Sequence, residues 1–392
     1  MGFSQALSGL NAAATNLEVI GNNIANSQTV GFKGGRTLFS DVFAEANTAL
    51  GTRVSDVQQD FTTGTLESTG RNLDLAISGE GFFRMVQNDQ VVYSRNGQLT
   101  IDSDGYFTNA QGAHLTGFAP GGAGGSPIEL QLGSGGLPAQ ATTSVGMAMN
   151  LDARAVAVDR LTVPFDAADE TTYSYSHNAT IYDSQGNAHS STLYFTKTAD
   201  NAWEVKMSRG TEVAPETGTL TFDTNGILVG TAGLGSFTYA PGGGVSNMDM
   251  SLDLTDATQF ATEFDPNAVD QDGYTSGNLV GVLIDDSGNI VGNYANQQTQ
   301  VLGTILLAKF TSPEGLRPIG DNAWSETGDS GQPLLGLAGT GVLGSLEAGV
   351  VESSNVDLTK ELVNLIIAQR NYQANTQTIK VQDEVLQAAV NL

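Results

Sequence analysis

Three glycines near the C-terminal end have a spacing that binds nucleotides in other proteins. Gly339, Gly341 and Gly344 form a G-x-G-x-x-G pattern, which cradles a dinucleotide when a strand precedes it and a helix opens at it. The stretch that follows, 345–354, is not helix-like, and no β-α-β pattern surrounds it. We therefore expect a glycine-rich surface turn and no nucleotide cofactor, because glycine adopts the backbone angles that tight turns need.

Aspartate-rich turns elsewhere in the chain resemble calcium loops. Asp270, Asp272 and Gly273 match three positions of an EF-hand loop, but Ala268 and Leu279 stand where its first and last ligands belong. Plain β-turns without metal are the preferred interpretation, and calcium binding is the alternative.

Catalytic motifs of the common hydrolases do not occur. The three histidines, His114, His177 and His189, lack metal-ligand spacing, and neither H-E-x-x-H nor G-x-S-x-G is present. A carboxylate pair for sugar hydrolysis stays open as an alternative, because 42 acidic residues offer many pairs. Four aromatic residues are interpreted as core rather than as a stacking platform: Phe82, Phe83, Tyr93 and Tyr106. We predict a protein that is not an enzyme, with a carbohydrate-active, β-rich surface protein as the alternative from a different class.

Composition limits the partners. The formal net charge is -26, from 42 acidic and 16 basic residues, which disfavours nucleic acid and anionic membranes. No run of 18 apolar residues occurs, so no membrane insertion is expected. Cysteine is absent, which fits an exported protein and a cytosolic one alike. No Lys or Arg precedes Lys33, so the start lacks the basic region of a cleaved signal peptide.

The C-terminal stretch 355–392 predicts one long helix without proline. Large side chains recur at a step of seven residues: Leu358, Leu365, Tyr372, Ile379 and Leu386. A second row begins with Leu362 and is mostly polar. A repeat of 3.5 residues keeps one apolar row facing partner helices, as in a coiled coil. Asn355 or Asp357 can cap the start, and a terminal helix docked on its own domain is the alternative.

The N-terminal residues 1–24 predict a matching helix, with Leu7, Leu10, Ala14, Leu17 and Ile24 at three-four spacing. Burying one large apolar side chain returns ~1.5–3 kcal/mol, whereas association first costs ~4–15 kcal/mol. Burial in one helix pair therefore exceeds the cost of association only slightly. A helix bundle shared among many copies gains much more free energy than association costs. We expect a subunit whose paired ends become ordered on assembly. The predicted interface residues are Leu7, Leu10, Leu17, Ile24, Leu358, Leu362, Leu365, Tyr372, Ile379 and Leu386.

A short motif of strand, Asp/Asn/Ser/Gly turn and strand recurs between the two helices. It occurs at 101–105, 222–226 and 284–288, with a variant one residue longer at 181–186. Such turns are typical of antiparallel β domains built from hairpins. The predicted fold is multi-domain and mainly β, with long N- and C-terminal α-helices paired as a coiled-coil-like layer and two nested antiparallel β domains.

The predicted domain division is nested. The segments are paired terminal helices at 1–24 and 354–392, an extended, partly stranded connector at 25–70, an inner β domain at 71–145 and 275–353, and an inserted outer β domain at 146–274. The insert carries 18 acidic residues against five basic ones, which suits a solvated face. Irregular loops are expected at 241–244 and 265–273, and a loop or domain boundary at 120–140, because glycine, proline and polar residues are frequent there.

At this point the sequence resembles a known family. LEVIGNNIANSQTVGFKGGR (17–36) is similar to the N-terminal signature of bacterial flagellar axial proteins, those of rod and hook, and 354–392 to their shared C-terminal helix. The segments 70–83, 95–118 and 292–310 resemble their first β domain. The acidic insert matches least closely. Its presence, with the total length, favours a subunit of the hook over the distal rod or a hook-associated protein, which are the alternatives within the family.

The resemblance implies a structural subunit of a short, curved, hollow tube that passes motor torque to the filament. The implied partners are further copies of the chain, the flagellar rod, the hook cap, the hook–filament junction proteins and the export apparatus. The implied location is outside the cell, reached without signal cleavage. The terminal helices would form the inner tube, and the β domains would form the outer shells.

Overall fold

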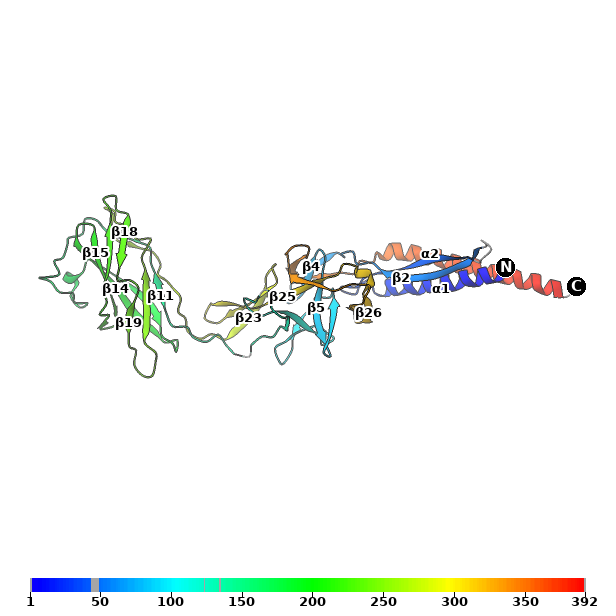
Figure 1. The fold of residues 1–392 in the computed structure, drawn as a ribbon, viewed down its shortest axis with the longest axis horizontal. Helices are drawn as coiled ribbons and strands as arrows, with labels where there is room; N and C mark the ends of the chain where they lie inside the picture. Colours follow the sequence, from blue (N-terminus) through cyan, green and yellow to red (C-terminus); the bar gives the residue numbers. More distant parts are fainter. Residues whose placement is uncertain (1, 44–48, 123, 134, 391–392) are drawn as a thin grey trace. The chain divides into compact units, whose positions relative to one another are not determined.

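The computed structural model describes residues 2–43, 49–122, 124–133 and 135–390 (Figure 1). The first residue and the last two of the predicted terminal helices, 1, 391 and 392, lie outside these ranges. The chain divides into two compact units. Unit 1 comprises 1–134, 281–293 and 299–392, and unit 2 comprises 135–280 and 294–298. The predicted four-part division has finer boundaries and stays a prediction.

Two long helices close unit 1, as predicted. Helix α1 spans Gly2–Ala25, and α2 spans Leu358–Val390. Between the two capping candidates, Asp357 caps α2, because its carboxylate accepts from the N–H of Thr359 at 2.9 Å. The helices lie side by side and antiparallel (Figure 1).

A long antiparallel hairpin lies along α1. Strand β1 (Gly35–Phe43) pairs with β2 (Ala49–Gln59), with register shifts at two places. Near the start of β2 a hydrogen bond joins the hairpin to the N-terminal part of α1: the N–H of Thr52 donates to the hydroxyl of Ser8 at 3.3 Å. The sequence predicted an extended, partly stranded connector, and the structure has a hairpin within it.

The β part of unit 1 has a branched 12-stranded sheet with the path β23-β24-β25-β9-β5-β6-β27-β26. The strands of this β part that come first in the chain, including two outside the large sheet, are β3 (Leu66–Ser68), β4 (Leu75–Ser78), β5 (Phe82–Gln87), β6 (Gln90–Ser94), β7 (Thr100–Ile101), β8 (Phe107–Thr108), β9 (His114–Phe118) and β10 (Ile128–Glu129). The later ones are β23 (Leu279–Ile284), β24 (Asn289–Tyr294), β25 (Thr299–Lys309), β26 (Arg317–Gly320), β27 (Ala323–Ser325), β28 (Leu334–Leu337), β29 (Ser345–Ala348) and β30 (Val350–Glu352). A 3₁₀ turn, η2 (Pro313–Gly315), precedes β26. Strands β3 and β4 pair with β30 and β29, so the two halves of this domain close on each other.

Unit 2 packs two main sheets around one core. Its strands are β11 (Ser144–Gly146), β12 (Met149–Asn150), β13 (Tyr175–Tyr182), β14 (Ala188–Ala199), β15 (Ala202–Arg209), β16 (Glu212–Val213), β17 (Gly218–Phe222), β18 (Leu228–Ala232), β19 (Phe237–Tyr239), β20 (Met248–Asp253), β21 (Asp265–Pro266) and β22 (Asp270–Gln271), with one 3₁₀ turn η1 (Glu170–Thr172). The larger sheet has the order β13-β14-β15-β17-β18, and the smaller β19-β20-β11-β22. Alternating residues of both sheets form the core, and Trp203 is among its fully buried members. Strand β11 pairs with β20 in parallel, and Asn150 forms a parallel bridge with Thr258; the other strand pairs described for this unit are antiparallel.

The recurring aspartate turns are confirmed as one structure repeated four times. In each, the leading carboxylate accepts from the backbone N–H two and four residues later, at 2.8–2.9 Å. The leading residues are Asp102, Asp183, Asp223 and Asp285. Each turn also holds a glycine with φ between 79° and 89°, a conformation that glycine adopts without strain.

Two of the predicted loops differ from expectation. The segment 265–273 contains the short strands β21 and β22, because its backbone pairs with β12 and β11. The carboxylate of Asp272, a calcium candidate, accepts from the N–H groups of Thr143 and Ser144 at 2.8 and 3.0 Å. The segment 120–140, predicted as a loop or boundary, contains β10, which pairs with β9, and also contains the division between the two compact units. The glycines from Gly339 to Gly344 form the turn between β28 and β29, closed by their own backbone hydrogen bond of 2.9 Å.

Candidate functional site

Helix α1 contacts both the hairpin and α2, and its buried side chains are mostly small. Ala6, Ala13 and Ile20 follow each other at seven-residue steps and are at most 8% exposed. Gly9 faces Asn375 of α2 so closely that an added Cβ would lie 3.0 Å from the side-chain oxygen. The contacts within the chain therefore use small residues, which let helix backbones approach. The sequence reasoning looked for large side chains and missed this row, although its spacing was visible.

The ten predicted interface residues lie elsewhere on the helices. Four of them are exposed, namely Leu7, Leu358, Leu362 and Leu386, at 42–58%. The other six are half-buried: Leu10, Leu17, Ile24, Leu365, Tyr372 and Ile379. The chain itself therefore covers six of these ten side chains in part and leaves four exposed, and their role as an interface between copies stays a prediction. The same holds for the expectation that the ends become ordered only on assembly.

A further apolar patch occupies the first turns of α2. Leu362, Val363, Ile366 and Ile367 are each 44–52% exposed. Together with Leu365 they make this stretch apolar around most of its circumference. A helix that is hydrophobic on all sides is normally buried. The run L-V-N-L-I-I was the signal for this patch, but the seven-residue analysis selected only two of its members.

A buried ion cluster joins three distant segments at the base of the helices. The carboxylate of Glu352, at the end of β30, accepts from Lys33 Nζ at 2.6 Å and from Arg95 Nη1 at 3.2 Å. The backbone N–H of Gly64 donates to the same group at 2.8 Å. All three charged side chains are at most 3% exposed. Sequence reasoning missed this cluster, because nothing local marks a pair separated by more than 300 residues.

Burial dominates the electrostatics of the cluster. It lowers the pKa of Lys33, and the attraction of Glu352 opposes that shift. Burial likewise lowers the pKa of Arg95 against the same opposing carboxylate. One carboxylate thus serves two buried cations. Removing that carboxylate would leave both cations without a charged partner in the cluster, which is far more costly than removing one cation.

Two asparagine side chains fasten both helices to adjacent glycines of the connector. Asn23 of α1 donates to the carbonyl of Gly35 at 2.8 Å and accepts from its N–H at 2.9 Å. Asn355, the second capping candidate, instead accepts from the N–H of Gly34 at 2.8 Å and donates to the carbonyl of Asp60 at 2.7 Å. We call Asn23, Lys33, Arg95, Glu352 and Asn355 the connector node. The node fixes the helices, the hairpin and the β domain of unit 1 relative to one another.

Chemical sites are few among the residues that the structure describes. Within them no group of three or more His, Cys, Asp or Glu side chains has an arrangement that could hold a metal ion. In the same ranges, no helix has both the length and the apolar character that crossing a bilayer requires. Of the four aromatic residues interpreted as core, Phe82, Phe83 and Tyr93 are at most 4% exposed, and Tyr106 stacks on His114 with ring centres 4.5 Å apart.

Comparison with known proteins gives matches along most of the chain. The matching family models are the flagella basal body rod protein (4–33), the flagellar hook protein FlgE/F/G D1 domain (76–167), the flagellar basal body protein FlaE D2 domain (150–274) and the flagellar basal body rod FlgEFG protein C-terminal (347–392). A solved structure of the Helicobacter pylori flagellar hook protein FlgE2 aligns with a TM-score of 0.55 at 14% identity, covering 73% of this chain and 100% of that one. That likeness supports the fold.

Full-length relatives carry the assignment. The flagellar hook protein FlgE of Escherichia coli K12 is 47% identical over 405 residues, and that of Salmonella typhimurium LT2 is 47% identical over 408 residues. Each alignment covers 100% of both chains. These relatives and the matching family models show that the chain belongs to the flagellar hook protein FlgE family, structural subunits that polymerise into the extracellular hook of the bacterial flagellum.

Proposed function

We propose that this chain joins its neighbours in the hook mainly through the exposed apolar side chains of α1 and α2. The observation that carries the proposal is the exposure of Leu362, Val363, Ile366 and Ile367 at the start of α2. Their burial would return ~1.5–3 kcal/mol for each side chain. In a polymer that gain recurs at every copy, so it can exceed the cost of association.

A substitution on this patch tests the proposal. Leu362→Asp and Ile366→Asp place a charge where a neighbour would bury the side chain, while both sites are exposed in the single chain. We expect both variants to keep their β units folded, as read by near-ultraviolet circular dichroism, and to form no tubes in electron microscopy. Gln373→Asp, at an exposed position farther along α2, is the matched control and should assemble. Normal tubes from Ile366→Asp would contradict the proposal.

The connector node supports a division of labour between the parts of the chain. Close-packed interiors resist deformation. In the node, part-buried hydrogen bonds join the helix ends to the connector, and buried ion pairs of Glu352 join the connector to the inner β domain. We assign torsional stiffness to the helical layer and the node, and bending to contacts of the outer domain at 146–274. The connector at 25–70 would set the tilt between them.

The outer unit is acidic, but its surface is not wholly polar. Exposed large apolar side chains occur on it at Val156, Leu161, Ile227, Val229 and Phe260. We therefore expect the outer units of neighbouring copies to touch mainly through hydrated polar contacts that can slide, with a few apolar contacts among them.

The finer partners remain part of the proposal. The family polymerises into the hook and contacts the rod and other flagellar components. We propose that this chain also meets a hook cap, junction proteins and the export apparatus, and that it works without catalysis. Support for the last point is the absence of hydrolase motifs in the sequence.

A further inference from the structure

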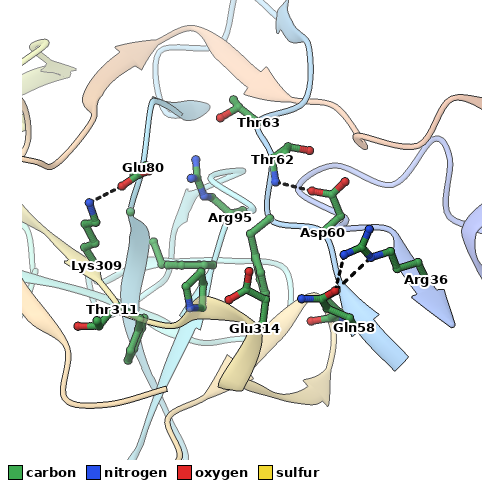
Figure 2. Close-up of a pocket in the computed structure, with 16 residues that line it drawn as sticks. Arg36, Gln58, Asp60, Thr62, Thr63, Glu80, Arg95, Lys309, Thr311 and Glu314 are labelled. Carbon is green, nitrogen blue, oxygen red and sulfur yellow. Dashed lines mark hydrogen bonds and ion pairs between the residues drawn. The ribbon is translucent and has the colours of Figure 1, made fainter. Parts of the chain in front are cut away.

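A cavity of about 630 Å³ opens between the base of the hairpin and strands β5 and β25 (Figure 2). Its walls include the aromatic rings of Phe61, Phe82 and Phe310. Phe82 lies edge-to-face with the other two, with ring centres 5.5 and 6.0 Å apart. The volume is within the range of typical ligand-binding pockets, so the cavity has room for more than one side chain of a partner. All lining residues belong to unit 1.

Charged residues of both signs line this cavity. The basic ones are Arg36, Arg95 and Lys309. They balance the acidic lining residues in number, whereas the chain as a whole has 42 acidic residues and 16 basic ones. The acidic residues that line the cavity are Asp60, Glu80 and Glu314. Among them Glu80 already pairs with Lys309, so the site is far less acidic than the chain as a whole.

One buried donor in the cavity wall has no acceptor. The Arg95 side chain is 3% exposed, and its terminal nitrogens donate to Glu352, to the carbonyl of Ile77 and to that of Gly79. Its Nε, also buried, has no hydrogen-bond partner. Figure 2 shows the guanidinium of Arg95 beside the cavity, between Glu80 and Thr62. A buried unpaired N–H on a cation is normally satisfied by a ligand or by water.

We propose that this cavity receives an acidic side chain, with an apolar neighbour in sequence, from a second copy of this chain. The carboxylate would meet Arg95 and the rim cations Arg36 and Lys309, and the apolar neighbour would pack on the phenylalanines. A second copy is the fitting occupant because its surface is strongly acidic and because the family polymerises. The inference rests on assembly of the hook but not on the helix rows, from which the cavity residues are separate.

A photo-crosslinker placed in the cavity tests this directly. Thr311 lines the cavity and is exposed, so it can be replaced by p-benzoyl-phenylalanine in the full chain. Tubes are assembled from a mixture of isotopically light and heavy chains, checked by electron microscopy and then irradiated. We expect crosslinks between light and heavy chains, onto a peptide that contains Asp or Glu, and none in the monomer.

Charge reversal at the rim shows whether charge holds the occupant. Lys309→Glu should lower the yield of intermolecular crosslinks about fivefold or more. Arg317→Glu reverses an exposed charge on the nearby strand β26, outside the lining residues, and should leave the yield unchanged. Intact tubes without intermolecular crosslinks would overturn the inference, and so would a yield insensitive to Lys309→Glu. Inorganic phosphate bound to the monomer, with no crosslink in tubes, would assign the site to a small free anion instead. Failure to form any tube would bear on assembly and not on the cavity.

Discussion

Lys33 and Glu352 are separated by 319 residues in sequence, yet Nζ of the first lies 2.6 Å from Oε1 of the second in a fully buried position. The pair joins the segment after α1 to the strand before α2. Both terminal helices therefore leave the β domain from one fixed place. If the helices form the inner layer of the tube, as we propose, a twist of that layer is transmitted to the β domain at this pair.

Loss of the shared carboxylate should be the most damaging single change in the node. Glu352→Gln leaves Lys33 and Arg95 without a charged partner in the cluster, and we expect a loss of ~3–5 kcal/mol in the free energy of unfolding. Lys33→Met keeps the Glu352–Arg95 pair and should cost clearly less. Urea unfolding followed by tryptophan fluorescence measures both, since Trp324 lies in this unit. If both variants lose the same free energy of unfolding, the shared carboxylate of Glu352 is no more important to the cluster than one of its cations.

Backbone conformation gives a matched pair of glycine variants. Gly31 has φ of 71°, and a Cβ there would lie 2.6 Å from the backbone nitrogen of Asn96. Gly31→Ala should lower the free energy of unfolding by ~1–3 kcal/mol. Gly21, within α1, has open space around the same position, so Gly21→Ala should raise helix stability by ~0.5–1 kcal/mol. Thermal unfolding of the two monomers should move in opposite directions, and a harmless Gly31→Ala would show that the connector is not tightly held.

Acid should weaken unit 2 through Asp183. Burial alone would raise the pKa of this carboxyl, but hydrogen bonds from His189, from Asn187 and from the Gln185 N–H outweigh it and hold the pKa well below its usual range. Because the folded pKa is depressed, the stabilisation is complete above about pH 4, the ordinary value. It is lost as the pH falls from there through the folded pKa.

The free energy of unfolding of Asp183→Asn, compared with that of the parent chain, measures this stabilisation. The variant should be less stable at neutral pH, and the difference should shrink below about pH 4. Asp249→Asn, at an exposed position on β20, is the control. Equilibrium unfolding across pH 2–7, followed by the fluorescence of Trp203, provides the measurement. A constant difference across that range would rule out the carboxylate as the source.

Removal of unit 2 tests the assignment of bending. Unit 2 comprises 135–280 and 294–298. Replacement of 135–278 by a short Gly/Ser linker removes most of it and leaves β23 (Leu279–Ile284) whole. We expect tubes that still assemble, because the helix rows and the node remain, but that lose their curvature in electron micrographs. A complete failure to assemble would show that the outer unit is needed for polymerisation itself.

The long, regular signals in the sequence predicted the fold well. The seven-residue row ending at Leu386 predicted α2, and the Asp-led turns at Asp102 and Asp285 predicted hairpins, because both patterns are local. The short strands at Asp270–Gln271 were missed, since their pairing with β11 overrides a loop-like composition. The node was beyond prediction for the same reason, as Glu352 has no local feature that points to Lys33.

The four aspartate turns bear on the order in which the chain can fold. Each takes its hydrogen bonds from within five consecutive residues, so each hairpin can close as soon as its own residues are free, in the fast regime of local contacts. Lys33, in contrast, must wait for Glu352. A chain that leaves the cell with its N-terminus first would therefore form its hairpins one after another. The contact between Lys33 and Glu352 would form only after β30, the last strand, has emerged.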